Sequence, residues 1–168
     1  SSAQLMDPKT AFNTLAILNR VGLDPRRLEL EITETAVMTD ADTAQKIVAE
    51  LRGAGVRISL DDFGTGQSSL GRLRDFTFDK VKIDRAFVSR ISNDKASEHI
   101  IKAIVAMCEG LDLAVVAEGI EDFSEALKLK ALGCGMGQGY FYGKPQDAVA
   151  TMRFLSDRYV SVEGRSVS

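Results

Sequence analysis

Two aspartates stand next to each other at the end of an apolar run, in the stretch Ile58–Leu70 that reads ISLDDFGTGQSSL. Adjacent carboxylates repel each other, and each loses hydration energy when it is buried. A glycine-rich segment follows Asp61 and Asp62 at once, so the chain can turn sharply beside them. Divalent cations would remove both penalties, which makes this pair a candidate metal site.

Charged residues also mark the carboxyl ends of other predicted strands. Along these strands aliphatic side chains alternate with polar ones, so the two kinds lie on opposite faces of the sheet. Polar residues near the strand ends include Glu31, Asp61, Lys82 and Glu118. If the aliphatic faces meet the helices, these side chains point to the other side, where barrel enzymes keep their chemistry at the carboxyl ends of the strands.

The residue types in this set favour one kind of metal. Oxygen-only ligands prefer Mg²⁺ or Mn²⁺, whereas zinc prefers His and Cys. The single histidine, His99, follows Glu98 in a predicted helix and is better explained as a solvated residue than as a ligand. A cluster of acids with one lysine suits two-metal phosphoryl chemistry, in which one metal and the lysine activate a water and both metals stabilise charge on the phosphate.

Each of these residues also has an ordinary structural explanation. An acid at a strand end is often a helix cap or a surface charge, and Asp62 could cap the turn that follows it. Lys82 could be a surface lysine on an edge strand, and we expect Lys80 and Asp84 to be structural or solvated. The joint pattern favours a site, although periodicity alone leaves both interpretations open.

The hydrophobic periodicity alternates between helical and strand types along the chain. The predicted helices cover residues 7–21, 43–51, 68–76, 97–108, 123–132 and 147–159, and the predicted strands cover 28–33, 57–62, 80–84, 113–118 and 136–141. This succession predicts parallel strands joined by right-handed crossovers. Two α/β architectures fit, an open doubly wound sheet or part of a (β/α)8 barrel, because the 168 residues are fewer than the roughly 250 of a whole barrel.

The composition argues against several classes of protein. The net charge of −3 lacks the basic surplus of a general nucleic-acid binder or of a protein that binds anionic membranes. No apolar run approaches the ~20 residues that cross a bilayer, and no basic-then-apolar signal segment is present at the start of the sequence. Cys108 and Cys134 have no CxxC spacing, so we expect free thiols in a reducing cytoplasm.

Five motifs stand in order along the chain. They are Glu31-Ile-Thr-Glu34, Asp61-Asp62-Phe-Gly-Thr-Gly with Ser68-Ser69-Leu70, Val81-Lys82-Ile-Asp84, Val116-Ala-Glu118-Gly-Ile-Glu121, and Gln138-Gly-Tyr140 with Lys144-Pro145. Together they resemble the EAL-domain family of cyclic di-GMP phosphodiesterases, from about Ser1 to Pro145. The resemblance implies an incomplete (β/α)8 TIM-type barrel, of which this chain holds the C-terminal five βα units. It also implies hydrolysis of the bacterial second messenger cyclic di-GMP to linear pGpG with Mg²⁺ or Mn²⁺, two ions in the complete domain.

The resemblance assigns metal ligands and catalytic residues to this chain. The metal ligands would be Glu31, Asp61, Asp62 and Glu118. The catalytic residues would be Lys82, Glu118 and Glu121. Lys82 would hold or activate the attacking water, and Glu121 would orient the site from behind the ligands.

The resemblance also assigns substrate contacts and a loop anchor. Gln138 and Lys82 would contact the substrate. Glu34 would anchor the loop Phe63–Leu70, which closes over the site and joins the dimer contact in this family. The Asp-Phe-Gly that leads into this loop also occurs in protein kinases, but no glycine-rich nucleotide loop precedes it and no HRD segment is present, so the kinase interpretation fails.

The sequence departs from the family pattern at three places. Gln67 stands where the family usually has Tyr, and Gly135 stands where an Asp commonly follows Cys. The Glu-Ala-Leu signature and the Asn of the Asn-Leu-Ser motif, which both supply metal ligands, are absent. We therefore expect the complete parent domain to hydrolyse cyclic di-GMP and these 168 residues to be inactive alone. The alternatives are a catalytically degenerate cyclic di-GMP sensor or protein-interaction module, and an inactive structural remnant.

The same interpretation sets the expected boundaries and partners. We expect a partial EAL domain over 1–160 and a polar C-terminal tail over 161–168. A barrel without its first strands has open edges, so we expect a homo-oligomer through those edges or through the Phe63–Leu70 loop. The expected ligand is cyclic di-GMP rather than general nucleic acid. The expected location is the bacterial cytoplasm, either directly or as the cytoplasmic part of a larger membrane-bound or multidomain protein.

Overall fold

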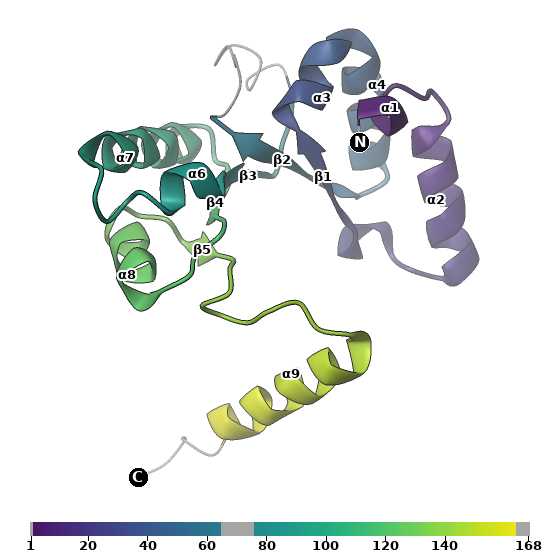
Figure 1. Cartoon of the computed structure of the whole chain (residues 1–168). Coiled ribbons are helices and arrows are strands. Elements are labelled where there is room, and N and C mark those ends of the chain that lie inside the picture. The colour runs from purple at the N-terminus through teal and green to yellow at the C-terminus, as the bar shows by residue number, and fades with distance from the viewer. Residues whose placement is uncertain (1, 65–75, 164–168) are drawn as a thin grey trace.

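The structure is a computed structural model that describes residues 2–64 and 76–163. The α-helices are α1 (Ser2–Leu5), α2 (Thr10–Val21), α3 (Glu34–Thr39), α4 (Ala41–Gly53), α6 (Arg85–Val88), α7 (Lys95–Gly110), α8 (Phe123–Ala131) and α9 (Ala148–Glu163), and η1 (Pro25–Arg27) is a 3-10 helix. The strands are β1 (Glu29–Thr33), β2 (Arg57–Phe63), β3 (Lys80–Ile83), β4 (Ala114–Ala117) and β5 (Met136–Gly137). Helices follow strands along most of the chain (Figure 1).

The five strands form one parallel sheet in the order β1-β2-β3-β4-β5. Each crossover therefore steps in the same direction along the sheet. A doubly wound sheet would reverse its order at a switch point, whereas a barrel adds its strands in sequence. The predicted α/β fold is confirmed, and of the two architectures that fitted the sequence, the strand order selects an arc of a barrel.

The helices bury the aliphatic face of the sheet, as the periodicity predicts. Helix α4 packs against β2, and helix α7 packs against β4. The buried stripes of the two helices are Ala44, Ile47, Val48 and Leu51 on α4, and Ile101, Ile104, Val105 and Cys108 on α7. On the strands, Ile58, Val81 and Ile83 are fully buried. Because side chains alternate along a strand, the polar residues between them lie on the opposite face of the sheet.

Aspartates fix the start of several helices. The carboxylate of Asp94 accepts hydrogen bonds from the backbone N–H groups of Ala96 and Ser97 at the start of α7. Asp122 does the same for Ser124 and Glu125 at the start of α8. Such caps satisfy backbone donors that have no partner within the helix. Asp84 likewise accepts from the N–H of Ala86 at the start of α6, so it has the structural role expected for it.

Some predicted boundaries differ from the structure. The last strand ends at Gly137 rather than Phe141, although Gln138 N still donates to the carbonyl oxygen of Ala117. The short helices α3 and α6 were not predicted, because each is too short for a helical apolar period to be visible. The helix predicted over 68–76 lies almost wholly outside the described residues. Residues 161–163 of the predicted tail continue helix α9, and 164–168 also lie outside the described residues.

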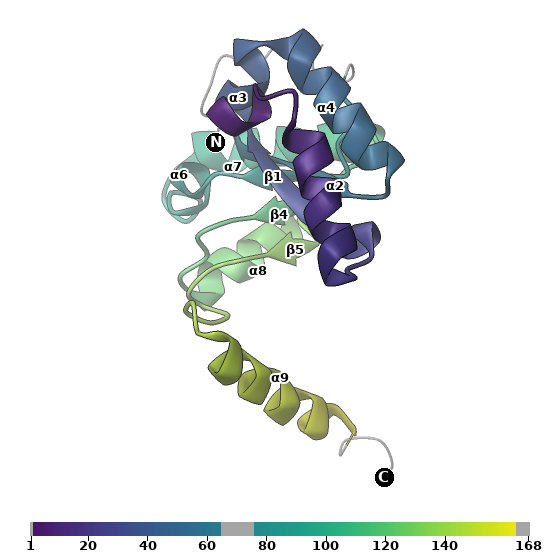
Figure 2. The same cartoon turned by 90° about the vertical axis from the view of Figure 1, so that its right-hand side faces the viewer.

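Helix α9 stands apart from the rest of the described chain. An extended segment connects it to β5 and carries it away from the sheet (Figures 1 and 2). Val149 and Met152 on this helix are 63% and 65% exposed, which leaves apolar surface uncovered. Over the described residues, no helix combines the length and the apolar character that a membrane span requires.

Candidate functional site

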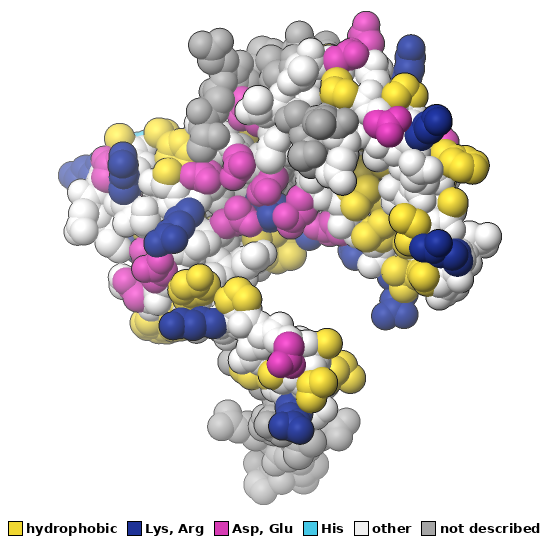
Figure 3. All heavy atoms as spheres, turned by 45° about the vertical axis from the view of Figure 1, so that its right-hand side comes forward, with side chains coloured by type: hydrophobic (Ala, Val, Ile, Leu, Met, Phe, Trp, Pro, Cys, Tyr) yellow, Lys and Arg dark blue, Asp and Glu magenta, His cyan; other side chains and the backbone are white. Residues whose placement is uncertain are grey.

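Lys82 lies at the centre of a cluster of carboxylates on the polar face of the sheet. Its Nζ atom lies 2.7 Å from Oε1 of Glu31, 3.1 Å from Oδ1 of Asp61 and 2.7 Å from Oε1 of Glu118. The Lys82 side chain is only 5% exposed, so the surface-lysine explanation is wrong. Figure 3 shows acidic side chains gathered around a basic one in the middle of this face.

The parallel strands bring these residues together from distant parts of the sequence. Glu31 and Asp61 lie near the ends of the paired strands β1 and β2. Lys82 lies on β3, which pairs with β2 on one side and β4 on the other. Glu118 directly follows β4, and its N–H donates to the carbonyl oxygen of Ile83. Four strand ends therefore deliver four charged side chains to one place.

A bulge in β2 places both members of the adjacent aspartate pair at the site. Leu60 pairs with Val81 and Phe63 pairs with Ile83, so β2 has one more residue than β3 between these two pairs. Asp62 lies in this bulge with φ of 57°, a left-handed conformation that is unfavourable for a residue other than glycine. Successive side chains of a regular strand point to opposite faces. The bulge breaks that alternation where the carboxylates are needed.

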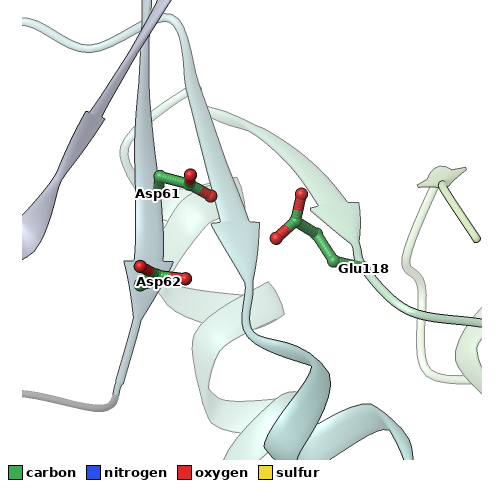
Figure 4. Close-up of side chains that lie close together, drawn as sticks. All are labelled: Asp61, Asp62 and Glu118. Carbon is green, nitrogen blue, oxygen red and sulfur yellow. The ribbon is translucent and has the colours of Figure 1, made fainter. Parts of the chain in front are cut away.

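Within residues 2–64 and 76–163, Asp61, Asp62 and Glu118 form a group with the spacing of metal ligands. One carboxylate oxygen from each residue lies within 4.8 Å of the other two. Asp61 and Asp62 come from β2, and Glu118 comes from the chain just after β4, as Figure 4 shows. Two oxygens on opposite sides of an ion at 2.0–2.6 Å lie roughly 4–5 Å apart, so this spacing is compatible with coordination of Mg²⁺, Mn²⁺ or Ca²⁺.

The electrostatics of the cluster show an excess of negative charge. Burial lowers the pKa of Lys82, but its close contacts with the carboxylates of Glu118, Glu31 and Asp61 outweigh burial and raise the pKa above the ordinary value, so this side chain is a cation. Burial raises the pKa of Glu118, and Lys82 opposes that rise. Burial also raises the pKa of Asp62, with further contributions from the negative charges of Asp61 and Asp84. One ammonium group thus faces more carboxylates than it neutralises.

One atom of the cluster is buried without a hydrogen bond. Asp61 Oδ1 has no hydrogen-bond partner in the described part of the chain, although it lies within ion-pair distance of Lys82. The Lys82 ammonium compensates part of the cost of burying this acceptor, and a bound cation would compensate more of it. The oxygen-only donors, the excess negative charge and this acceptor therefore fit a hard divalent cation.

Glu34 lies beside the cluster and contacts the start of the glycine-rich loop. It is 4% exposed, and its Oε2 atom accepts a hydrogen bond of 3.3 Å from Gly64 N. Its Oε1 atom has no hydrogen-bond partner among the described residues. Residues 65–75 lie outside the described part, so the anchoring of the Phe63–Leu70 loop stays a prediction that this contact supports.

Glu121 follows Glu118 by about one turn of chain, and the Gln138 backbone pairs with the end of β4, but neither residue is part of the ion pairs of the cluster. The carboxylate of Glu121 accepts a hydrogen bond from Arg85, and the Glu121 side chain is half exposed. Gln138 is exposed, and its backbone pairs with Ala117 and Ile120. Their predicted roles in orienting the site and contacting the substrate stay predictions. Sequence reasoning missed Arg85, and its position directly after Asp84 in the lysine motif was the available signal.

The two cysteines have no part in this chemistry. Cys108 and Cys134 are free, as expected, and both are buried. Burial raises the pKa of the Cys108 thiol to about 11 and also raises that of Cys134. Reactive cysteines have a lowered pKa, so these two are structural.

Comparison with known proteins agrees with this fold and this arrangement. Residues 1–145 match the EAL domain family, and the chain belongs to that family. The chain is 43% identical over 131 residues to the bifunctional diguanylate cyclase/cyclic di-GMP phosphodiesterase MucR of Pseudomonas aeruginosa, covering 78% of this chain and 19% of MucR. Across eight curated relatives, MucR among them, this chain spans between 16% and 36% of the relative's length.

Two solved structures show the same architecture. The MucR phosphodiesterase in complex with c-di-GMP superposes with a TM-score of 0.86 at 38% identity, over 90% of this chain and 61% of that one. A manganese and cyclic di-GMP complex of Klebsiella pneumoniae BlrP1 superposes with a TM-score of 0.76 at 35% identity, over 82% of this chain and 35% of that one. The resemblance inferred from the five motifs is therefore confirmed at the level of family and fold.

Proposed function

We propose that this chain supplies the lysine and most of the carboxylates of a site that hydrolyses cyclic di-GMP to linear pGpG with Mg²⁺ or Mn²⁺. The observation that carries the proposal is the convergence of Glu31, Asp61 and Glu118 on one buried lysine, Lys82. Membership of the EAL domain family and the c-di-GMP complex of MucR support the choice of substrate. The manganese complex of BlrP1 supports a divalent metal.

The carboxylates of Glu31, Asp61, Asp62 and Glu118 would hold the divalent ions. Bound there, such ions polarise a phosphate oxygen and lower the pKa of a bound water. Asp61 would serve more than one partner, because it lies 3.1 Å from Lys82 Nζ and also has a carboxylate oxygen within 4.8 Å of one from Asp62 and one from Glu118. The bulge at Asp62 keeps the pair on the same side of the strand.

Lys82 would position the attacking water and the phosphate. Its ammonium group has no proton-accepting capacity, so it acts by donating hydrogen bonds and by stabilising negative charge. In the reaction, water oxygen bonds to phosphorus and the bond from phosphorus to the 3′ oxygen breaks. The water loses a proton and the leaving 3′ oxygen gains one, which opens the ring and leaves a 5′ phosphate on pGpG.

The finer expectations about location and assembly are consistent with this proposal but do not carry it. A cyclic di-GMP phosphodiesterase would act in the bacterial cytoplasm, where its substrate is a second messenger. Self-association through the sheet edge at β1 or through the Phe63–Leu70 loop stays a prediction, and residues 65–75 of that loop lie outside the described part.

The decisive assay measures binding and turnover separately. The chain is assayed by itself, and also as a chimera in which residues 1–145 replace the matching segment of the MucR EAL domain. Formation of pGpG from cyclic di-GMP and Mn²⁺ in either context, with at least a 100-fold loss on Lys82→Met, supports the proposal. Nucleotide binding without turnover in both contexts supports the alternative of a sensor. Absence of nucleotide binding in both rejects the proposal.

A further inference from the structure

The turn formed by residues 118–121 carries a candidate metal ligand at one end and a predicted orienting residue at the other. Its Glu118 carboxylate contacts Lys82 at 2.7 Å, and its Glu121 carboxylate is outside that cluster. The backbone of the turn is tied at several points. Glu118 N donates to Ile83, Ile120 N donates to the carbonyl oxygen of Gln138, and Glu121 N donates to Oε2 of Glu125 at 2.8 Å.

On one side, the 138–141 segment presses directly against this turn. A Cβ atom on Gly139 would lie 2.1 Å from the carbonyl oxygen of Ile120, far inside van der Waals contact. Phe141 N also donates to that oxygen, at 3.0 Å. The backbone itself therefore fixes this side of the turn, and no side chain is involved in the contact at Gly139.

On the other side, one side chain covers the turn. The aliphatic part of Arg85 lies over Gly119, where an added Cβ would meet Arg85 Cγ at 2.4 Å and Cβ at 2.7 Å. Gly119 has φ of 70°, so glycine is favoured there on both steric and conformational grounds. The guanidinium group of Arg85 then reaches past Gly119 and donates to Oε1 of Glu121. Arg85 thus contacts the turn with its stem and binds its far end with its charge.

Arg85 also belongs to the other half of the site. It is the first residue of α6, and the preceding Asp84 caps that helix and contributes to the raised pKa of Asp62. Arg85 therefore connects the end of β3, the strand that contains Lys82, with the segment after β4 that contains Glu118. The Arg85 and Glu121 side chains are 63% and 51% exposed, and their pair differs from an isolated surface ion pair because the Arg85 stem also packs on Gly119.

We propose that Arg85 is a positioning residue for the Lys82 cluster, because it holds the 118–121 turn so that the Glu118 carboxylate stays against Lys82. The metal-binding part of this inference rests on the proposed function. The effect on the turn does not, because it concerns contacts within this chain alone.

The first measurement is amide hydrogen exchange of the turn in the 168-residue chain. Arg85→Met keeps much of the stem and removes the charge, and Arg85→Lys restores a charge. We expect Arg85→Met to speed exchange of the Ile120 and Glu121 amides, which donate hydrogen bonds to Gln138 and Glu125, at least fivefold and Arg85→Lys to restore part of the protection. Arg26→Met is the matched control, because Arg26 and Asp24 form an exposed ion pair at 2.8 Å within a different part of the chain. It should leave the turn unchanged.

A second variant removes the partner of Arg85 in the same ion pair. Glu121→Gln keeps Arg85 and weakens the pair, so it should also speed exchange of the turn. It decides the question if circular dichroism shows that Arg85→Met is unfolded. Unchanged exchange in the folded variants would overturn the proposal, because a pair that holds the turn cannot be removed without effect.

The third measurement is calorimetric titration with Mn²⁺. We expect Arg85→Met to weaken Mn²⁺ binding about tenfold, as happens when other residues that orient metal ligands are replaced. Arg85→Lys should recover most of the Mn²⁺ affinity. Arg26→Met should bind Mn²⁺ as tightly as wild type does. Wild-type affinity in Arg85→Met would overturn the positioning role even if exchange is faster. If wild type binds no Mn²⁺, the metal part of the proposed function fails, and the exchange result alone decides whether Arg85 holds the turn.

Discussion

Asp61 and Asp62 are consecutive in β2, yet both have a carboxylate oxygen within 4.8 Å of one from Glu118. A regular strand would turn one of the two away from the site. The bulge between Leu60 and Phe63, with Asp62 at φ of 57°, puts both on the same side. The fold accepts local repulsion and backbone strain at this point, which is typical of functional sites.

That strain can be separated from the charge by two substitutions at one position. Asp62→Gly and Asp62→Ala both remove the carboxylate, but only glycine adopts φ of 57° without strain. We expect Asp62→Gly to have a free energy of unfolding about 1 kcal/mol higher than Asp62→Ala in urea denaturation without metal. Both variants should lose Mn²⁺ affinity. Equal stabilities would mean that the bulge relaxes when the carboxylate is removed.

Lys82 holds together carboxylates that would otherwise repel one another. Lys82→Met keeps the buried stem and removes the ammonium group. We expect it to lower the free energy of unfolding by about 2 kcal/mol without metal, less than for a fully buried pair because Glu31 is half exposed. Urea denaturation at neutral pH measures this change. Lys130→Met, at an exposed position on α8, is the control, and its free energy of unfolding should stay within about 0.5 kcal/mol of the wild-type value. A similar loss of stability in Lys82→Met and Lys130→Met would contradict a special role of Lys82.

The helix caps predict how stability depends on acid pH. Hydrogen bonds from Ser97 and from the Ala96 N–H lower the pKa of Asp94, and those from Glu125 and Ser124 lower that of Asp122. A carboxylate whose pKa is lower in the folded state stabilises the fold above its unfolded value of 3.8, and that contribution is lost as the pH falls through the lowered value. Stability should therefore decline below about pH 4.

Asparagine variants test that decline. Asp94→Asn and Asp122→Asn keep a capping acceptor that does not titrate. Their urea midpoints should fall less between pH 6 and pH 3 than the wild-type midpoint does. Glu50→Gln, on the exposed face of α4, is the control and should follow wild type. Parallel curves for all four proteins would show that the caps do not cause the acid sensitivity.

The β1 edge of the described sheet predicts self-association. A groove of about 560 Å³ lies between α2 and β1, and its lining includes Ile17, which is 50% exposed. Unpaired strand edges and exposed apolar side chains favour pairing with another chain. Light scattering after size-exclusion chromatography should show a dimer whose fraction rises with protein concentration and falls in Ile17→Glu. Lys102→Glu on α7 should leave the dimer unchanged, and a monomer at every concentration would refute this expectation.

Much of the fold and of the cluster could be predicted from local pattern. Alternating apolar and polar residues predicted which side of each strand carries Glu31, Asp61 and Lys82, because side-chain direction in a strand depends only on position. Parallel pairing then brings strand ends together without any further information. Short strands and short helices were harder, since β5 has only two residues, Met136 and Gly137, and its extent is set by pairing with β4.

What could not be predicted depends on pairing between segments. The bulge in β2 exists only relative to its pairing with β3, so the sequence of β2 alone does not reveal it. Arg85 contacts Glu121 because Gly119 leaves room for its stem, a relationship across the ends of two strands. The burial of Lys82 likewise follows from the strands on either side of β3.

The most direct test of the account is calorimetric titration of Mn²⁺ into the metal-free chain and into Asp61→Asn. Asn keeps the shape of the side chain and removes the charge beside Lys82 and Asp62. The account predicts saturable binding to wild type, at least a tenfold loss of affinity in Asp61→Asn, and no loss in Glu98→Gln, an exposed acid on α7. Equal Mn²⁺ affinity in wild type and Asp61→Asn would contradict a metal site at these strand ends.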